Sequence, residues 1–396
     1  MKHYVFFLLA IVTLASCNGQ TKNPVKKQSQ LVGGGCDGCE LMYVDTPRNI
    51  RAVDTSAGWY EDGTKLIITG TVFQLGGKTP APNVILYYWQ TDNTGHYTYK
   101  KGMTEKARPH GFIRGWVKTD SAGHYTIHTL RPAPYPDDVS PAHIHLSIKE
   151  PDVENEYYTD EINFDDDKLL IPHLKKYPQE KRGGSGIVRV LLQGDLQIAE
   201  HDIVLGLNIP NYPKTLAQKN LSGLNIAEDQ PSFMPYHAYG PDSGTQTCPV
   251  CKYGRYHGIV YFVGNKPDWN DIKSWLTFLE RESVKRQRYL KVYFVYGNEN
   301  NYNKEVRMQE IEQIGKKLNI VHTALTFVPS FTNTATEAHL NKINPEVENT
   351  FIIYKHRSIV DKHINLKPTK ENFRAISQSL NKTQGLYFNL PEPEHD

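Results

Sequence analysis

The sequence predicts a multidomain protein in which a β-sandwich is followed by an α/β domain. Its 396 residues are enough for two or three domains. Short strand-like runs fill the first half, whereas helical patterns alternate with apolar strands in the second half. A pair of histidines on one predicted strand indicates where the chemistry of the first half lies.

The first half contains strand-like runs at regular spacing. Clusters of Gly, Pro, Asn and Asp separate them, and they lie at 66–73, 83–90, 112–118, 124–129, 143–149 and 187–192. Short β runs without helical periodicity are typical of a sandwich or a related barrel. We therefore expect a β domain over residues 36–212.

The second half has a different pattern. A continuous apolar run at 258–263 precedes a stretch with helical periodicity at 269–281, and the alternation continues with strands at 292–296, 320–328 and 350–355 and a helix at 302–318. Helices that alternate with apolar strands indicate a sheet covered on both faces. We expect a linker at 213–230, an α/β domain at 231–385 and a tail at 386–396.

The N-terminus has the pattern of an exported protein. Lys2 and His3 precede an apolar run at 4–14, and the run ends in Leu-Ala-Ser-Cys at 14–17. The run is too short to span a bilayer, and a plain signal peptide or the start of a buried helix are the alternatives. Because the motif resembles a bacterial lipobox, we expect a signal peptide at 1–16, a lipid on Cys17 and a polar linker to residue 35. The protein would then be anchored on the periplasmic or cell-surface side of a membrane.

Four further cysteines form two Cys-x-x-Cys pairs, Cys36/Cys39 and Cys248/Cys251. Such pairs can bind zinc. The two pairs lie in different predicted domains, however, and an exported protein meets an oxidising environment. Local disulfides, Cys36–Cys39 and Cys248–Cys251, are therefore the favoured interpretation.

The overall charge is nearly balanced, with 45 basic and 43 acidic residues. This balance gives no electrostatic argument for a nucleic-acid partner.

The stretch 129–146 holds the candidate chemistry. In His143-Ile144-His145 the two histidines are two residues apart, so on a strand both point to one side while Ile144 points to the other. Two imidazoles at that separation can bind one metal ion, although two ordinary surface histidines are the simpler interpretation of this motif alone. Upstream, Tyr135 lies between two prolines, which restrict its backbone.

The neighbouring motifs favour the metal. Their order along the chain is Thr-Gly-His-Tyr at 94–97, Thr-Asp-Ser-Ala-Gly-His-Tyr at 119–125, Pro-Tyr-Pro at 134–136 and Pro-Ala-His-Ile-His at 141–145. This order resembles the intradiol ring-cleavage dioxygenases, the family of catechol and protocatechuate dioxygenases. The resemblance covers roughly residues 65–205. It implies a non-haem ferric ion held by Tyr97, Tyr135, His143 and His145.

The resemblance also implies the reaction. A small aromatic diol and O2 would be the substrates, and the ring would open between the two hydroxylated carbons. Ferric iron is a hard Lewis acid that suits anionic oxygen and imidazole, and a bound cation can deprotonate a phenol whose ordinary pKa is about 10. Tyr135 would be the catalytic tyrosine that takes up a substrate proton, and Tyr97 would stay bound to the iron.

Two positions depart from the family pattern. Family members usually carry an arginine immediately before the Pro-Ala-His-Ile-His run, where this chain has Ser140. A glutamine expected on the next strand is replaced around Thr159 and Asp160. Arg114 and Arg131 are candidates for a substituting positive charge.

The second half resembles a thioredoxin-like domain, with Cys248 and Cys251 near its start. In active thioredoxins the cysteines follow the first central strand, whereas here they precede the strand expected at 258–263. This order favours a structural or sensing role. Three functions remain open: a ferric dioxygenase, an intradiol-like binding module that has lost turnover, and a thiol–disulfide redox protein acting through Cys248 and Cys251.

Overall fold

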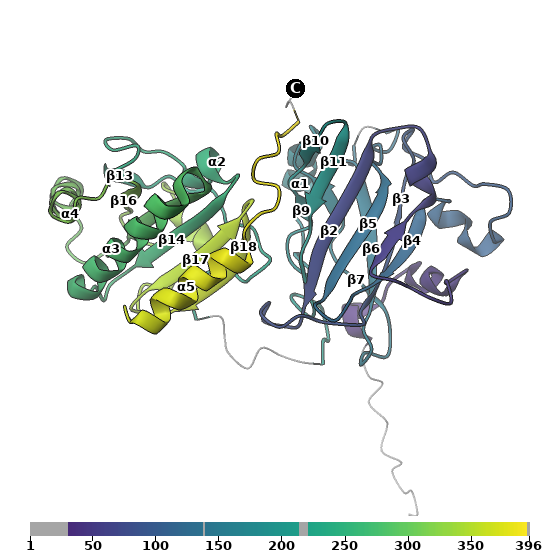
Figure 1. Ribbon diagram of the computed structural model, residues 1–396, viewed down its shortest axis with the longest axis horizontal. Coiled ribbons are helices and arrows are strands. Elements are labelled where there is room, and N and C mark those ends of the chain that lie inside the picture. The colour runs from purple at the N-terminus through teal and green to yellow at the C-terminus, as the bar shows by residue number, and fades with distance from the viewer. Residues whose placement is uncertain (1–30, 138, 214–220, 394–396) are drawn as a thin grey trace, which may run out of the picture. The chain divides into compact units, whose positions relative to one another are not determined.

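The structure is a computed structural model that describes residues 31–137, 139–213 and 221–393 (Figure 1). The predicted signal peptide and Cys17 lie outside the described residues, as does part of the predicted linker. Within the described ranges the strands form three six-stranded sheets. Two of these sheets belong to residues 53–204 and the third belongs to residues 236–364.

The first sheet has the strand order β1-β5-β2-β11-β10, and β12 pairs with the end of β2. Its strands are β1 (Val53–Thr55), β2 (Lys65–Phe73), β5 (His124–Leu130), β10 (Leu191–Gln193), β11 (Leu196–Glu200) and β12 (Ile203–Val204). Gly70 of β2 lies against His201, which is in the connection between β11 and β12. A Cβ there would be 1.8 Å from the carbonyl oxygen of His201, so this close approach requires glycine.

The second sheet carries the histidine pair and has the order β4-β3-β6-β8-β9, with β7 also pairing with β6. Its strands are β3 (Ile85–Gln90), β4 (Arg114–Lys118), β6 (His143–Lys149), β7 (Tyr157–Tyr158), β8 (Ile162–Phe164) and β9 (Ile187–Val188). The strands expected from the sequence at 66–73, 83–90, 112–118, 124–129 and 143–149 are confirmed. The run expected at 187–192 is divided into β9 and β10, which join different sheets.

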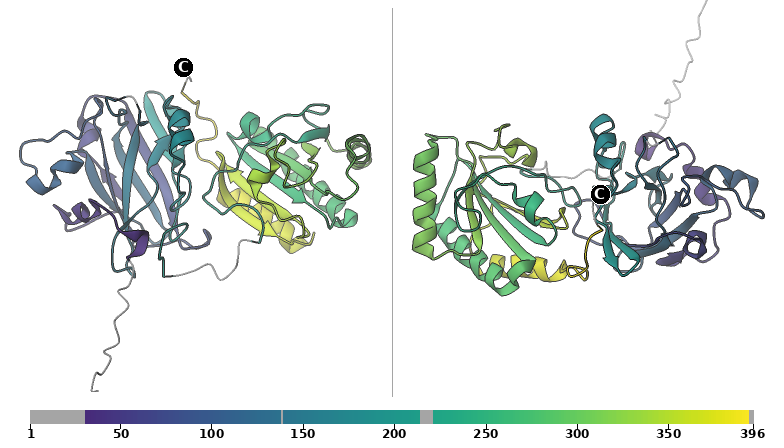
Figure 2. Two further views of the ribbon diagram at one scale, coloured as in Figure 1. Left: turned by 180° about the vertical axis from the view of Figure 1, so that it is seen from behind. Right: turned by 90° about the horizontal axis from the view of Figure 1, so that it is seen from above.

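The two sheets pack face to face as a sandwich (Figure 1, Figure 2). Their inner faces share one core, to which the first sheet contributes Leu66, Ile68 and Ile127 and the second contributes Leu86, Ile144 and Leu146, all fully buried. Burying each such side chain stabilises the fold by about 1.5–3 kcal/mol relative to leaving it exposed. Short helices lie outside the sandwich: η1 (Val32–Gly34), η2 (Cys39–Tyr43), η3 (Ala57–Tyr60), η4 (Glu105–His110) and α1 (Leu170–Lys176).

The third sheet has the order β13-β16-β15-β14-β17-β18. Three central strands are parallel, β14 (His257–Val263), β15 (Leu290–Tyr296) and β16 (Thr323–Phe327), and the antiparallel strands are β13 (Tyr236–Tyr239), β17 (Thr350–Lys355) and β18 (Ser358–Ile364). This mixed α/β sheet agrees with the expected second domain. The thioredoxin-like assignment stays a prediction.

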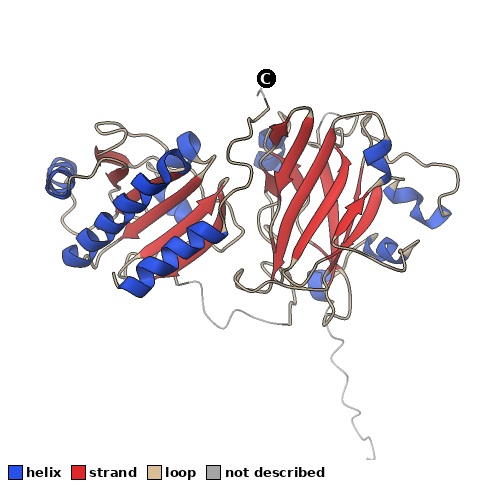
Figure 3. Ribbon diagram, in the orientation of Figure 1, coloured by secondary structure: helices blue, strands red, loops and turns tan. Residues whose placement is uncertain are grey.

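Helices cover one face of this sheet (Figure 3). They are α3 (Trp269–Arg286), α4 (Lys304–Leu318) and α5 (Lys370–Lys382), and their apolar residues pack on side chains that alternate along the central strands. The other face is covered by loops, by α2 (Pro249–Tyr253) and by η6 (Ala338–Asn341). A short η5 (Gln287–Tyr289) follows α3. In the part of the chain that the structure describes, no helix has the length and apolar character that a membrane span requires.

Several boundaries differ from the sequence prediction, as when the strand expected at 320–328 is β16 and the helix expected at 269–281 continues to Arg286, and two of the differences have a clear local reason. Helix α4 begins at Lys304 and not at 302, because the Asn303 side chain caps it by accepting a hydrogen bond from the Val306 amide. Residues 221–230, expected as linker, pack on the third sheet: Leu224 and Ile226 join its core, and the Ala227 amide bonds to the Ile359 carbonyl.

Candidate metal centre

The two histidines lie at the start of β6. This strand is flanked by β3, which places Trp89 opposite His145, and by β8, which places Asn163 opposite His143. Ile144 between them is fully buried in the sandwich core. The alternation expected from the sequence is therefore confirmed, and both imidazoles point away from the core to one side of the sheet.

Tyr97 is brought to the histidines by a tight loop after β3. The Asp92 carboxylate organises the loop by accepting hydrogen bonds from the Thr94 amide and hydroxyl at 2.8 and 2.6 Å. Gly95 has a positive φ of 82°, and a Cβ there would be 2.1 Å from the Pro134 carbonyl oxygen. Only glycine allows this loop to lie so close to the segment that carries Tyr135.

Tyr135 is held by the same pair of loops. The Ala133 amide donates to the Asp92 carbonyl at 3.0 Å, and the Thr91 hydroxyl donates to the Ala133 carbonyl at 2.8 Å. The prolines on either side of Tyr135 fix two backbone φ angles. The two tyrosines thus approach each other because hydrogen bonds to the Asp92 and Ala133 carbonyls tie the two irregular segments together.

Four donor atoms converge in the space above β6. The Tyr97 hydroxyl oxygen lies 2.8 Å from both the Tyr135 oxygen and His145 Nε2, and His143 Nε2 lies 3.2 Å from the Tyr135 oxygen and from His145 Nε2. Donors that surround one small ion at about 2.0–2.2 Å are themselves about 3 Å apart. The spacing and the mixture of phenol oxygen and imidazole nitrogen therefore fit a hard transition-metal ion.

The two imidazoles are held in the tautomer that metal binding needs. His143 Nδ1 donates to the Pro141 carbonyl at 2.7 Å, and His145 Nδ1 lies 2.9 Å from a carboxylate oxygen of Glu161. Both partners are acceptors, so the proton resides on Nδ1 and leaves Nε2 with a free lone pair. The segment before His143 is held as well, since the Ala142 amide donates to Asp167 at 2.7 Å.

Burial controls the ionisation of the site. It raises the pKa of Tyr97 far above the ordinary phenol value, with a further contribution from the hydrogen bond to Tyr135. Burial also raises the pKa of Tyr135, against the opposing effect of the hydrogen bond with Tyr97, and the charges of Glu161 and Asp137 add to the rise. Burial lowers the pKa of His143. The phenols therefore need a strong cation to ionise at neutral pH, and His143 is ready as a neutral ligand.

Glu161 was not predicted as a site residue from the sequence. The sequence analysis expected a glutamine on this strand and found it replaced around Thr159 and Asp160. Burial raises the pKa of Glu161, but the hydrogen bond from His145 and the charges of the neighbouring histidines outweigh it and leave the pKa at about 2. Glu161 is thus an anion at neutral pH. Among the described residues, the ligand atoms of His143, His145 and Glu161 all lie within 4.8 Å of one another.

An aromatic layer supports His145 from the adjacent strand. Trp89 stacks on the His145 ring with centroids 4.8 Å apart and on His110 with centroids 4.0 Å apart. His110 in turn bonds through Nδ1 to the Tyr87 hydroxyl at 2.9 Å. Burial lowers the pKa of His110 to about 3, so this ring stays neutral and packs as an apolar neighbour.

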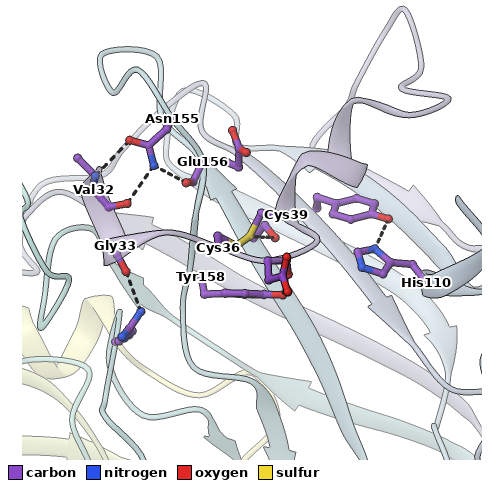
Figure 4. Close-up of a disulfide and its surroundings, with 12 residues drawn as sticks. Val32, Gly33, Cys36, Cys39, His110, Asn155, Glu156 and Tyr158 are labelled. Atoms are coloured by element: carbon purple, nitrogen blue, oxygen red, sulfur yellow. Dashed lines mark hydrogen bonds between the residues drawn. A yellow bond between two sulfur atoms is a disulfide. The ribbon is translucent and has the colours of Figure 1, made fainter. Parts of the chain in front are cut away.

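The N-terminal segment that carries Cys36 and Cys39 lies near His110 of this layer (Figure 4). Cys36 and Cys39 are joined as a disulfide, Cys39 Sγ accepts a hydrogen bond from the buried Ser147 hydroxyl, and the Tyr158 hydroxyl donates to the Asp37 carbonyl at 2.7 Å. Gly38 lies against the His110 ring. The disulfide loop therefore supports the outer side of the layer that positions His145.

The two arginines considered as substitutes for the family arginine are engaged elsewhere. Arg114 donates to Asp45 at 2.7 Å and to the Val44 carbonyl. Arg131 donates to Asp166 at 2.8 Å and lies over the Phe164 ring. Neither guanidinium is free to bind a substrate, so the expectation that one of them replaces the charge missing at Ser140 is not supported.

The second pair of cysteines lies at the start of the α/β part. Cys248 and Cys251 are joined as a disulfide, Cys248 caps α2 by accepting from the Cys251 amide, and the pair precedes β14 as the sequence indicates. Cys248 is buried and Cys251 is exposed.

Comparison with known proteins finds similarity to dioxygenases over this part of the chain. The model of the dioxygenase family matches residues 42–182. A curated relative, catechol 1,2-dioxygenase 2 from Acinetobacter lwoffii, is 27% identical over 158 residues, which cover 34% of this chain and 55% of the relative. The chain thus spans about half the length of that relative. Residues 42–182 thus match a dioxygenase family model, and this part of the chain is distantly similar to a catechol dioxygenase.

Dioxygenases are also among the solved structures to which the chain is similar. The dioxygenase domain of a dioxygenase carbohydrate-binding protein fusion from Streptomyces sp. SirexAA-E is 26% identical, with coverage of 41% of this chain and 89% of that domain and a TM-score of 0.31. Catechol 1,2-dioxygenase from Acinetobacter sp. ADP1 is 20% identical, with coverage of 44% and 63% and a TM-score of 0.32.

Proposed function

We propose that the sandwich is a non-haem ferric dioxygenase that cleaves a catechol-like diol with O2 between its two hydroxylated carbons. The observation that carries the proposal is the convergence of four donor atoms at 2.8–3.2 Å, from Tyr97, Tyr135, His143 and His145. The domain match over residues 42–182 supports the reaction class.

The donor set suits the ion. Two phenolates and two neutral imidazoles give hard, anionic coordination that favours the ferric state. The bound ion would supply the Lewis acidity that ionises the phenols and activates the diol toward O2. In the overall reaction one carbon–carbon bond of the ring breaks, and both atoms of O2 enter the product as parts of its two carboxyl groups.

The residues of the chain have distinct tasks in this reaction. Tyr135 lies on an irregular loop between two prolines and is the base that takes a proton from a substrate hydroxyl at its phenol oxygen. Tyr97 contacts both Tyr135 and His145 and stays in place as the second phenol ligand. The two imidazoles keep their Nδ1 protons because a carbonyl and a carboxylate accept them.

The proposal is tested by the colour and metal content of the purified full chain. We expect about one iron per chain, a visible absorption band from tyrosinate bound to ferric iron, and oxygen uptake with catechol that matches the ring-opened product one to one. A chain that holds iron but consumes no oxygen with any of a panel of catechols would instead be a binding module. A colourless, iron-free chain that exchanges disulfides would instead act through Cys248 and Cys251.

We also propose that the protein is lipid-anchored through Cys17, on the evidence of the Leu-Ala-Ser-Cys sequence at 14–17. Each buried methylene of an acyl chain contributes about 0.8 kcal/mol, so two chains hold a folded domain at a membrane. We expect a Cys17→Ser variant to keep its iron and to leave the membrane fraction, as measured by fractionation and mass spectrometry of the N-terminus. A wild-type chain found in the cytoplasm with residues 1–16 intact would refute the anchor.

A further inference from the structure

We propose that Glu161 is a positioning residue for His145 and not an additional metal ligand. The inference rests on the proposed function, since it concerns how the same four donors bind iron. It deepens that function by assigning a role to an acidic side chain that the ligand motif does not contain.

The geometry separates Glu161 from the four donors. The donor cluster contacts His145 through Nε2, which lies 2.8 Å from the Tyr97 oxygen. Glu161 Oε1 contacts the other ring nitrogen, Nδ1, at 2.9 Å. Because the two nitrogens face different sides of the ring, a carboxylate on Nδ1 acts on an ion at Nε2 only through the imidazole.

The two histidines are held by unlike partners. His143 Nδ1 donates to a neutral main-chain carbonyl, that of Pro141, whereas His145 Nδ1 donates to a carboxylate. A charged acceptor makes the stronger hydrogen bond, fixes the ring more firmly and makes Nε2 more basic. His145 is therefore the imidazole that Glu161 adjusts, and stacking on Trp89 restricts the same ring from its face.

Glu161 also sits where it can be replaced without disturbing the core. It directly precedes β8, whose Ile162 pairs with Ile144 of the histidine strand, so its backbone is fixed relative to His145. Its side chain is 43% exposed and borders a cavity of about 470 Å³ that also reaches His145 and Thr159. The Thr159 hydroxyl, buried beside this cavity, has no hydrogen-bond partner among the residues that the structure describes. Shortening Glu161 thus enlarges a polar cavity and leaves the apolar core intact.

Three full-length variants test the role: Glu161→Ala, Glu161→Gln and, as the control, Asp137→Asn. Asp137 is an exposed acid on the Tyr135 loop, and like Glu161 its charge raises the pKa of Tyr135. Unlike Glu161, it makes no bond to His145, so it separates the effect of charge from the effect of that bond. The measurements are iron affinity, by competition with a chelator, and the position of the visible absorption band.

We expect Glu161→Ala to weaken iron binding about 10–100-fold, the loss typical when the partner of a ligating histidine is removed. Glu161→Gln should keep most of the affinity, because the amide oxygen still accepts the Nδ1 proton, but should shift the absorption band because the charge is gone. Asp137→Asn should not weaken iron binding, because the Asp137 charge only opposes the ionisation of Tyr135.

Different results overturn different conclusions. Wild-type affinity in Glu161→Ala, in a chain that does bind iron, overturns the positioning role alone. Loss of iron in Glu161→Gln as complete as in His143→Ala overturns it too, because that result makes Glu161 a direct ligand. An equal loss in Asp137→Asn would show a general charge effect and would also overturn it. A wild-type chain that binds no iron overturns the proposed function itself.

Discussion

A His143→Ala, His145→Ala double variant is expected to contain no iron, to be colourless and to show no ring cleavage above background. The change removes two of the four donor atoms, which leaves two phenols whose pKa values burial raises. Phenols in that state bind a cation poorly, so the remaining donors cannot hold the ion alone. Metal analysis, the visible spectrum and oxygen uptake with catechol measure the effect.

A matched control is available on the neighbouring sheet. His124 and His128 lie on β5, where His124 is exposed and His128 packs on Trp59 and bonds to Thr55. A His124→Ala, His128→Ala variant removes the same side chains from a strand and should keep its iron and its colour. Normal iron content in the His143, His145 variant would refute the metal assignment. Because Ile144 keeps its place in the core, circular dichroism should show both variants folded.

The part of the site that was predictable from the sequence depends on local periodicity. His143 and His145 had to share a face of any strand that contained them, and the structure buries Ile144 on the opposite face. Helix α3 was likewise recognisable from apolar residues at helical spacing. The ends of elements were less predictable, because caps such as Asn303 act through a single side chain.

The remainder of the site depends on contacts between distant segments. Trp89 reaches His145 only through the pairing of β3 with β6, and the disulfide loop of Cys36 and Cys39 reaches Ser147 across more than a hundred residues. Glu161 contacts His145 because β8 pairs with β6 at Ile162 and Ile144. No local pattern encodes such a register, and a shift of one residue would have placed Asp160 or Ile162 there instead.

The charge around the site follows from the same contacts. Arg114 and Arg131 form ion pairs with Asp45 and Asp166. Their positive charges are therefore not available to a substrate at the four donor atoms. Glu161 and Asp137 are the acidic groups that act on Tyr135. The proposed function therefore assigns the uptake of the substrate proton to Tyr135, on a loop that carries Ser140 where an arginine was expected.

A Tyr135→Phe variant is accordingly expected to keep iron but to lose at least about 100-fold in the rate of ring cleavage, the lower end of what a positioned acid–base group contributes. Three donors remain, so iron binding weakens without being abolished, and the visible band changes because one of two tyrosinates is gone. Single-turnover oxygen uptake and the absorption spectrum measure the two effects separately. Tyr99→Phe is the control, since Tyr99 is an exposed tyrosine on the Tyr97 loop whose hydroxyl donates to the Met103 carbonyl and contacts none of the four donors. An unchanged rate in Tyr135→Phe would assign the proton to another group, and an unchanged spectrum would remove Tyr135 from the ligand set.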